Sequence, residues 1–342
     1  MTAVHVLVTG ATGFVGGAVA RALTERGYRV RALVRPGRDL SGLRERGVEA
    51  VEGDLLDPAS VSAAVQGVEG VFHAAAVYAY WSADPSIIYR VNVDGTARLL
   101  EAAHRAGVRR VVFTSTVATL RWPGPGRLAD EGSVASLEEM TGHYKRSKWL
   151  AERAALAANG EGLDVVAVNP TAPFGPGDAR PTPTGRIVLE FLRRRFPGYV
   201  RTGVNAVDVA DVAAGHVSAF ERGRAGERYI LGNENLTLGE VYRLLREATG
   251  LRRLPVRVPY WLAFGAGVVD GLVEGRLLGR EPYIPVEGLR VSRRPMYTDC
   301  SRAVGELGLP QTPAAEALER AARWYVDCGY VDVRPAWRTS AG

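Results

Sequence analysis

The turn that joins the first predicted strand to the first predicted helix constrains the fold more than any other feature of this chain. Its residues, VTGATGFVGG, follow the apolar run HVLVT and lead into the helical pattern FVGGAVARALTERG, with Gly10, Gly13 and Gly16 three residues apart. Glycines at this spacing let the backbone turn sharply, approach a pyrophosphate closely and pack the helix on the sheet. Because 40 glycines produce such triplets by chance, the prediction of a dinucleotide site depends on this position between a strand and a helix.

Strand-like and helical segments alternate through the first half of the chain. Helical patterns begin near Pro58 and cover about 85–107 and 143–159. The apolar, β-branched runs that we predict as strands are residues 5–9, 29–34, 48–53, 71–76, 110–115 and 164–169. This alternation is typical of βαβ units, whose parallel strands share one sheet with helices on both faces. With right-handed crossovers it predicts an α/β fold of the Rossmann type, a doubly wound parallel sheet.

The second half of the chain has a different pattern and predicts a smaller, helix-rich lobe that would bind the substrate. Helical spacing recurs near 186–196, 207–223, 238–249 and 314–328, separated by loops rich in proline and glycine. The division we predict is a cofactor-binding domain at 1–170 with 204–232 returning to it, a substrate lobe at 171–203 and 233–333, and a frayed tail at 334–342.

The composition is that of a globular enzyme without a nucleic-acid partner. The net charge of +6 is spread along the chain, and short basic clusters lack interleaved aromatic residues. Cys300 and Cys328 have no metal-ligand spacing and form no disulfide framework, which favours a reducing cytoplasm and no metal site. The N-terminal residues show no pattern of a signal peptide.

One apolar segment, at 259–269, raises the question of membrane contact. It is too short to span a bilayer and is followed by Asp270 and Glu274. We expect a buried helix there, and a helix lying against a membrane surface or an apolar substrate stays open as the alternative.

The chain contains only two lysines, Lys145 and Lys148, among 43 basic residues. Tyr144 and Lys148 are four residues apart on a predicted helix and therefore share a face. An ammonium beside a phenol lowers the phenol pKa from about 10, and it can grip ribose hydroxyls better than a planar guanidinium. This pairing explains why Lys148 would not be replaced by arginine, whereas Lys145 points to another face and has no comparable explanation.

The end of the second predicted strand bears on the choice of cofactor. An Asp or Glu there usually holds the ribose 2′-hydroxyl of NAD. In this chain the strand ends at Val34 and Arg35 follows, which can pair with a 2′-phosphate. The sequence therefore favours NADP(H), with NAD(H) as the alternative.

Several motifs together resemble the extended short-chain dehydrogenase/reductase family, within the NAD(P)-dependent epimerase/dehydratases. They are TGATGFVG at 9–16, the threonine-rich end of the fifth strand, YKRSK at 144–148, GDL at 53–55, HAAA at 73–76, NVDGT at 92–96, NPTAPFGPGD at 169–178 and DCSRAVGELG at 299–308. The chain is most similar to the dihydroflavonol-4-reductase-like branch and its hopanoid-associated "sugar epimerase" members.

The resemblance implies roles for individual residues. Tyr144 would be the general acid, Lys148 would bind the nicotinamide ribose, Thr116 would orient the substrate carbonyl and Asn92 would support the active-site helix. The implied cofactor contacts are Gly10, Thr12, Gly13, Phe14, Val15, Gly16, Arg35, Asp54, Leu55, His73, Ala74, Ala75, Lys148 and Pro170. The candidate substrate contacts are Ser115, Tyr78, Tyr80, Trp81 and Thr171, and we expect the side chain of Ser115 to point away.

Three reactions share this apparatus. Dehydration needs an added acid–base pair where this chain reads Thr116-Val117-Ala118, which argues against it. A reductase that exchanges NADPH fits Arg35, and VYAYW at 77–81 offers an aromatic surface for an apolar aldehyde or ketone, including a terpenoid-derived one. A sugar-nucleotide epimerase holding NAD is the second interpretation, and a non-catalytic NADP(H) sensor is the third. The family implies a homodimer formed through the helices at 85–107 and 143–159.

Overall fold

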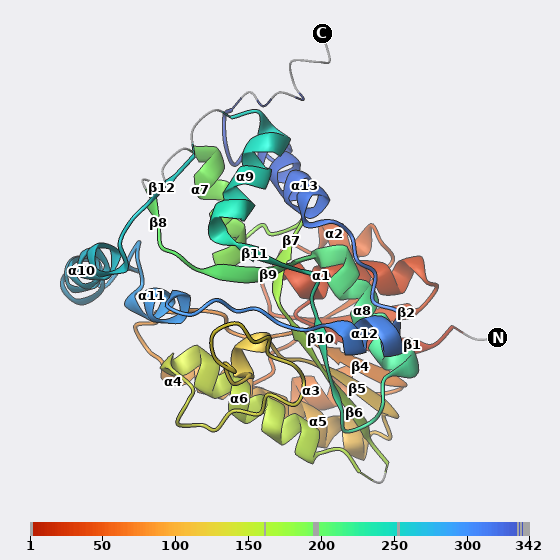
Figure 1. The fold of residues 1–342 in the computed structure, drawn as a ribbon. Coiled ribbons are helices and arrows are strands. Elements are labelled where there is room, and N and C mark those ends of the chain that lie inside the picture. Colours follow the sequence, from red (N-terminus) through yellow and green to blue (C-terminus); the bar gives the residue numbers. More distant parts are fainter. Residues whose placement is uncertain are drawn as a thin grey trace.

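Seven parallel strands form the main sheet of the computed structural model, which describes residues 3–160, 162–193, 198–251, 254–333, 335 and 337 (Figure 1). The strands are β1 His5–Thr9, β2 Arg29–Val34, β3 Glu49–Glu52, β4 Gly70–His73, β5 Arg110–Thr114, β6 Asp164–Pro170 and β10 Arg228–Leu231. Their order is β10-β6-β5-β4-β1-β2-β3, so the chain reverses direction across the sheet between β1 and β4. A crevice beyond the carboxyl ends of the strands at such a switch point is where α/β sheets bind ligands. The predicted doubly wound α/β fold is confirmed.

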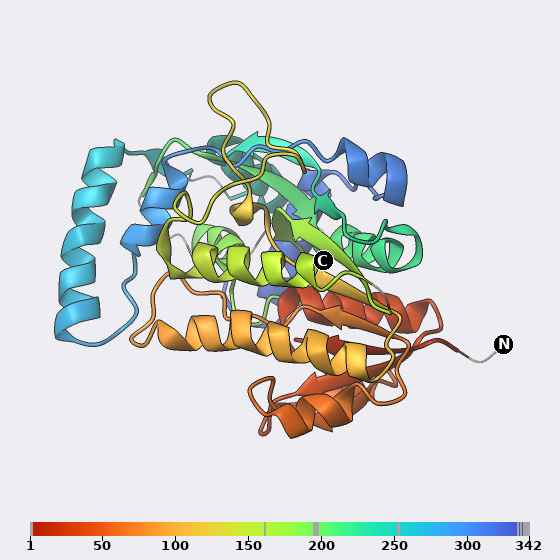
Figure 2. The same cartoon turned by 90° about the horizontal axis from the view of Figure 1, so that it is seen from below.

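Helices cover both faces of this sheet because successive strand residues point to opposite sides. Val6 and Val8 of β1 lie in the apolar layer beneath α1 (Phe14–Glu25), α8 (Val209–Arg222) and α12 (Ser301–Leu307). Leu7 lies in the opposite layer, beneath α3 (Pro58–Ala64), α5 (Gly95–Arg105) and α6 (Gly142–Ala157). Figure 2 shows α5 and α6 running side by side across that second face. The short α2 (Ser41–Arg44) precedes β3.

The helix predicted at 85–107 contains a local change of pitch. It consists of α4 (Ser86–Tyr89), a π-helical turn η1 (Arg90–Asp94) and α5. Such π turns often occur at functional sites because they re-aim one side chain. Here the turn carries Asn92, which is buried.

The strand predicted at 71–76 ends earlier, at His73. The backbone N–H of Ala74 donates to the carbonyl oxygen of Thr9 (3.2 Å), and that of Ala75 donates to the Thr9 hydroxyl (3.2 Å). Because of these bonds, the segment after β4 passes over the end of β1. Ala74 and Ala75 therefore do not continue the strand pairing of β4 and border the glycine turn instead.

A three-stranded sheet is the centre of the second lobe. Its order is β11 (Glu234–Thr237), β9 (Gly203–Asp208) and β7 (Ala172–Phe174). Three helices share an apolar cluster with it, α7 (Pro183–Arg193), α9 (Leu238–Thr249) and α13 (Ala314–Asp327). A small ladder joins β8 (Gly198–Tyr199) to β12 (Val256–Arg257). Of the segment expected to return to the main sheet, β10 and α8 do so, whereas β9 pairs with β7 and β11.

The apolar segment expected to form a buried helix is largely exposed. It forms α10 (Tyr260–Asp270), which continues into the π-helical η3 (Gly271–Leu277). Gly267 is its single buried residue, and Trp261 is 73% exposed, so the buried-helix prediction is wrong. The physical reason is that, among the described helices, only α11 (Val286–Ser292) packs closely against α10 besides its own continuation η3. Within the described part of the chain, no helix combines the length and apolarity needed to cross a bilayer. The predicted frayed tail lies mostly outside the described residues, as does the end of the helix predicted at 186–196.

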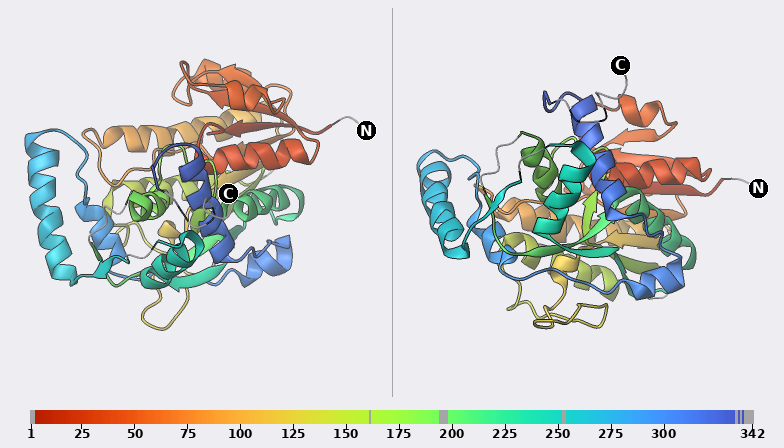
Figure 3. Two further views of the ribbon diagram at one scale, coloured as in Figure 1. Left: turned by 90° about the horizontal axis from the view of Figure 1, so that it is seen from above. Right: turned by 45° about the horizontal axis from the view of Figure 1, so that its top comes forward.

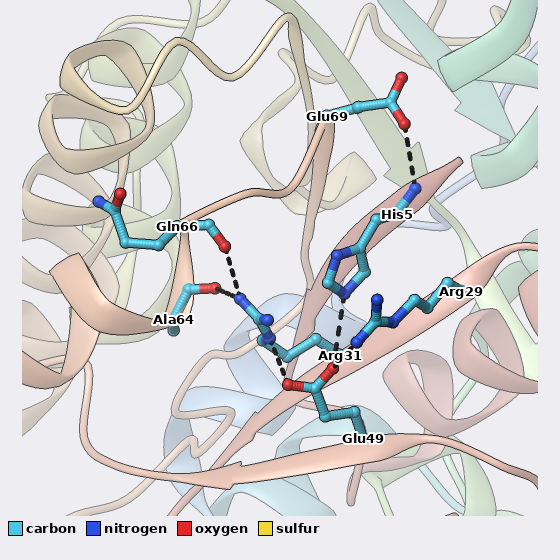
Figure 4. Close-up of polar contacts among 7 residues, drawn as sticks. All are labelled: His5, Arg29, Arg31, Glu49, Ala64, Gln66 and Glu69. Atoms are coloured by element: carbon cyan, nitrogen blue, oxygen red, sulfur yellow. Dashed lines mark hydrogen bonds and ion pairs between the residues drawn. The ribbon is translucent and has the colours of Figure 1, made fainter. Parts of the chain in front are cut away.

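Polar contacts tie together the strand ends opposite the ligand crevice (Figure 4). Glu49 of β3 accepts from Arg29 (3.2 Å) and Arg31 (2.9 Å) of β2, and it lies 3.7 Å from His5 of β1. Arg31 also donates to the backbone carbonyls of Ala64 and Gln66 (3.0 and 2.7 Å), which links β2 to the end of α3. Burial and the two arginines lower the pKa of His5. This cluster stabilises the sheet edge far from the glycine turn.

Candidate active site

The glycine turn has the geometry that a pyrophosphate requires. Gly10 has φ +76°, and a Cβ on it would lie 2.7 Å from the backbone nitrogen of Ala75. A Cβ on Gly16 would collide with the carbonyl oxygen of Gly10, so the first turn of α1 can press against the loop only without side chains. Gly13 is the N-cap of α1 and no side chain caps it, which leaves backbone donors at the helix N-terminus for an anion. These residues therefore fit a bound dinucleotide.

The remaining predicted residues of the turn lie around the same opening. Thr12 and Gly13 are exposed, whereas Phe14 and Val15 are half-buried at the first turn of α1. Ala74 and Ala75 are also half-buried and border the loop from the end of β4.

His73 ties three elements together beneath the crevice. Its Nδ1 lies 2.7 Å from the hydroxyl of Thr9 in β1, and its Nε2 lies 2.9 Å from the hydroxyl of Thr96 in α5. The imidazole is 1% exposed, and burial, with a further contribution from Lys148, lowers its pKa to about 3. The His73 side chain therefore links β1, β4 and α5 inside the protein. The cofactor path that we expected it to line is bordered by the neighbouring Ala74 and Ala75 instead.

A second buried histidine gives the fold a pH dependence. Burial lowers the pKa of His216 to about 4, and its ring bonds Thr114 and the carbonyl of Val212. Both imidazoles gain protons near pH 6.5 only when the chain unfolds, so the unfolded state binds more protons between about pH 6.5 and the folded pKa values. The stability that the two neutral imidazoles contribute is therefore fully present above about pH 6.5 and is lost as the pH falls below that value.

We expect the free energy of unfolding to fall by about 2 kcal/mol per histidine between pH 7 and pH 5. The measurement is the urea midpoint at each pH. His73→Gln should make the change between pH 7 and pH 5 less unfavourable by about 2 kcal/mol relative to the wild type. The exposed His104 is a matched control, and its replacement by glutamine should leave the change as it is in the wild type. If His73→Gln and the wild type lost the same free energy of unfolding, His73 would not be the buried, neutral imidazole that the structure shows.

Tyr144 lies in the first turn of α6 and is packed against aromatic rings. It is 7% exposed, with its ring centroid 4.5 Å from that of Tyr78 and 6.2 Å from that of Tyr80. Its hydroxyl shares a hydrogen bond with Thr116, which also accepts from the backbone N–H of Ala118 (3.2 Å). The structure thus brings together the predicted acid and the predicted carbonyl-orienting residue.

The electrostatic environment of Tyr144 differs from our expectation. Burial raises the pKa of its phenol well above the usual value of 10, the charge interaction with Tyr80 raises it further, and the bond from Thr116 acts in the opposite direction. We had expected the ammonium of Lys148 to lower this pKa. Burial outweighs any such effect, and the pKa of Tyr144 is raised instead. The reason is that enclosure by aromatic rings deprives a phenolate of water.

Lys148 lies one turn further along α6 and is 4% exposed. Its Nζ donates to the carbonyl oxygen of Thr114 (2.7 Å) and lies 4.6 Å from the ring centroid of Phe113. Burial lowers its pKa to about 8, while the carboxylate of Glu152 opposes that shift. The ammonium is therefore held at the carboxyl end of β5, on the same helical face as Tyr144.

Asn92 connects α6 to the loop that follows β4. Its side-chain oxygen accepts from the N–H of Val77 (2.7 Å), and its amide donates to the carbonyl of Val77 (3.1 Å) and to Ser147 (3.0 Å). Ser147 in turn donates to the backbone carbonyl of Tyr144 (2.8 Å). The π turn thereby connects the aromatic loop after β4 to α6, which agrees with the supporting role implied by the resemblance.

A buried carboxylate that we did not predict lies one further turn along α6. Glu152 accepts hydrogen bonds from Ser115, Thr119 (3.0 Å) and Asn169 (2.7 Å), and it pairs with Arg228 at 3.0 Å. The side chain of Ser115 therefore points away from Tyr144, as expected. The spacing Tyr144–Lys148–Glu152 put all three on one helical face, which was the signal that could have revealed this residue.

The other residues predicted to contact the cofactor lie at the carboxyl ends of strands. Arg35 is exposed directly after β2. Asp54 follows β3 and its carboxylate accepts from the N–H of Leu56 (2.8 Å). Leu55 is buried against Gly95, where a Cβ would lie 3.3 Å away.

Two predicted residues follow β6. Pro170 ends that strand beside Leu231 of β10. The N–H and the hydroxyl of Thr171 both lie within hydrogen-bond distance of the Leu231 carbonyl (3.1 and 3.3 Å). The Thr171 hydroxyl therefore bonds a neighbouring strand, and its contact with a substrate stays a prediction.

The substrate lobe contributes a second carboxylate near α6. Glu287 of α11 lies directly against Gly142, whose φ is +81°. Burial raises the pKa of Glu287 to about 7, and the charge of Lys145 acts against that shift. Lys145, for which the sequence offered no explanation, therefore faces Glu287 on α11 of the second lobe.

A comparison with known families identifies the family to which the fold belongs. A family model described as the NAD dependent epimerase/dehydratase family matches residues 6–232. The chain belongs to this family. Its members of this length are the extended short-chain dehydrogenases/reductases whose motifs the sequence resembles, and the chain is accordingly an enzyme of NAD(P)-dependent redox chemistry.

Relatives within the family include both reductases and epimerases. The chain is 46% identical over 328 residues to a Synechocystis protein named "Putative dihydroflavonol 4-reductase", with 95% of each chain covered. It is 36% identical over 326 residues to sterol demethylase protein B of Methylococcus capsulatus, covering 95% of this chain and 99% of that one. The solved structure of gox2253 has a TM-score of 0.85 at 40% identity, covering 97% of this chain and 100% of the other. A nucleoside-diphosphate-sugar epimerase from Pseudomonas aeruginosa has a TM-score of 0.79 at 27% identity, with the same coverage.

Proposed function

We propose that this protein reduces an apolar aldehyde or ketone with NADPH, with Tyr144 as the proton donor. The observation that carries this proposal is the position of the Tyr144 hydroxyl, which is bonded to Thr116 and enclosed by Tyr78 and Tyr80. Reduction requires a proton donor beside a carbonyl-binding hydroxyl, and both are present at the carboxyl edge of the sheet.

Each residue has a defined task in this reaction. The nicotinamide, when bound, supplies the hydride that reduces the carbonyl carbon. Tyr144 gives its phenolic proton to the substrate oxygen, and burial keeps the phenol protonated at neutral pH. Thr116 donates a hydrogen bond that orients that oxygen, and Lys148 supplies a positive charge that stabilises the phenolate left behind. Tyr144 and Lys148 lie on α6 and Thr116 follows β5 closely, so the three side chains can act on one bound substrate.

The preference for NADP(H) is supported by Arg35. Its guanidinium is exposed at the end of β2, where an acidic residue would hold the 2′-hydroxyl of NAD. A guanidinium at this position can make paired hydrogen bonds to a 2′-phosphate.

The aromatic residues after β4 support an apolar substrate. Tyr78 and Tyr80 meet edge to face (5.7 Å between ring centroids), and both lie against Tyr144. Names of relatives point the same way, since flavonoids and sterols are polycyclic. We therefore propose polycyclic or terpenoid carbonyl compounds, hopanoid-derived ones included, as the substrate class. We also propose a cytoplasmic homodimer that meets through the exposed side of α5 and α6.

A sugar-nucleotide epimerase with retained NAD is the second candidate function. The fold similarity to a nucleoside-diphosphate-sugar epimerase favours it. Such an enzyme would recycle its own nicotinamide and would need a pocket for a diphosphate. A non-catalytic NADP(H) sensor is a third, weaker candidate because the chain keeps both Tyr144 and Lys148.

One assay separates these candidates. We expect purified protein to oxidise NADPH with polycyclic aldehydes or ketones, at a kcat/KM at least tenfold higher than with NADH. Arg35→Glu should reverse the coenzyme preference, whereas Arg44→Glu, at another exposed arginine, should not. Tightly retained NAD with interconversion of a UDP-hexose would overturn the proposal in favour of the epimerase. NADPH binding without turnover on any carbonyl would favour the sensor.

A further inference from the structure

An apolar helical rod, made of α10 and η3, stands at the outer edge of the second lobe. Figures 2 and 3 show α10 from the side as a column set apart from the body of the molecule, and Figure 1 views it nearly along its axis. Its attachment is narrow. A Cβ on Gly267 would lie 2.7 Å from Leu289, and the carboxylate of Asp270 accepts from the N–H of Ile284 (2.6 Å). The rod is therefore fixed along one side and open along the other.

The open side of the rod carries exposed apolar side chains from its first turn to its last. Trp261 is 73% exposed, Val269 61% and Leu277 78%. Further exposed side chains of the same surface are Leu262, Leu272 and Leu278. Monomeric proteins rarely leave a continuous apolar surface of this extent in water, so such a surface marks a binding face. It is separate from the crevice that holds Tyr144.

Arginines flank this apolar side at both ends. Arg201, Arg257 and Arg293 line one open cavity together with Tyr260, the first residue of the rod. At the other end Arg276 lies on the rod, four residues after Leu272, and Arg280 follows three residues beyond the end of η3. The five guanidinium groups are exposed.

The rod has two acidic side chains, which the five arginines outnumber. Asp270 is half-buried and accepts from the N–H of Ile284 in the loop before α11. Glu274 is half-buried three residues before the end of the rod, and both carboxylates border the open side. The open side therefore combines an apolar centre with cationic ends.

We propose that the α10–η3 rod lies in the interface of an anionic lipid bilayer. Its apolar side would enter the acyl boundary, Trp261 would sit at the level of the headgroups, and the flanking arginines would contact anionic phosphates. The charge distribution selects this occupant. In a two-fold pair of rods, parallel or antiparallel, the cationic ends of one rod would meet cationic ends of the other.

The test is co-sedimentation of the whole protein with vesicles of phosphatidylcholine alone or mixed with phosphatidylglycerol. We expect binding to the mixed vesicles and little to the neutral ones. Arg276→Gln with Arg280→Gln should weaken binding more than tenfold at low salt, since each interfacial arginine contributes about fivefold. Trp261→Ser with Leu277→Ser should also weaken it more than tenfold. All four sites are exposed, so the variants should keep the wild-type melting temperature.

Matched controls fix the position of the surface. Leu128→Ser with Val134→Ser changes exposed apolar residues in the loop before α6, and Arg44→Gln with Arg127→Gln removes two exposed charges elsewhere. Both should bind like the wild type. Equal loss in controls and rod variants, or no binding of the wild type to mixed vesicles, would overturn the proposal. So would sedimentation velocity without lipid in which the wild type self-associates and Trp261→Ser with Leu277→Ser does not, because a second copy would then cover the rod.

Discussion

Replacing Tyr144 with phenylalanine should lower kcat for carbonyl reduction by about two to four orders of magnitude. The substitution removes the proton donor and the hydrogen bond to Thr116, yet the aromatic ring that packs against Tyr78 stays. The loss of one buried hydrogen bond should cost only about 1 kcal/mol of stability. Steady-state kinetics and thermal unfolding of the same preparation measure the two effects separately.

The matched control for that variant is Tyr89→Phe. Tyr89 lies on α4 and its hydroxyl is 3.2 Å from His143, outside the aromatic enclosure. Its kinetics should stay within a few-fold of the wild type. The affinity for NADPH, measured by fluorescence titration, should be nearly unchanged in both variants. If Tyr144→Phe kept more than a tenth of the wild-type kcat, another group would be the proton donor.

Replacing Glu152 with glutamine should reduce the free energy of unfolding by about 3–5 kcal/mol. The carboxylate is 3% exposed and pairs with a guanidinium that is 11% exposed, so its removal leaves the Arg228 charge buried without an anion. Denaturant unfolding at neutral pH measures the loss. Glu101→Gln provides the control, because its ion pair with Arg105 is exposed and should contribute less than about 1 kcal/mol.

A double-mutant cycle tests the origin of that loss. Arg228→Met combined with Glu152→Gln should be less destabilising than the sum of the single changes by more than about 1 kcal/mol, since the double variant has no unpaired buried charge from the pair. Strictly additive losses would contradict the assignment of Glu152 and Arg228 as a coupled pair.

The parts of the fold that depend on local periodicity could be predicted from the sequence. Strands buried on both faces are apolar throughout, and the glycine turn has one structural interpretation once a strand precedes it and a helix follows it. The face shared by Tyr144 and Lys148 also followed from helical geometry alone. These features involve neighbours in sequence, and the structure places them as the pattern indicates.

What could not be predicted depends on contacts between distant segments. The pairing of β9 with β7 and β11 is decided by how the second lobe packs, and the burial of α10 depended on a partner helix that is too small to cover it. The rise in the pKa of Tyr144 follows from rings supplied by residues 78 and 80, more than sixty positions earlier. Glu152 was overlooked because its four partners come from three separate strands and their loops.

The contact between Trp81 and the α10–η3 rod has a consequence for the route by which a substrate would reach Tyr144. A Cβ on Gly275 of η3 would lie 3.3 Å from the Trp81 indole nitrogen, and Trp81 directly follows Tyr80, which borders Tyr144. If the rod lies in the membrane interface as proposed, Trp81 and the aromatic residues beside Tyr144 would lie next to the lipid leaflet. The rate of reduction of a lipid-dissolved carbonyl compound would then depend on the mole fraction of that compound in the leaflet. Adding inert lipid at a constant total amount of the compound would lower the rate.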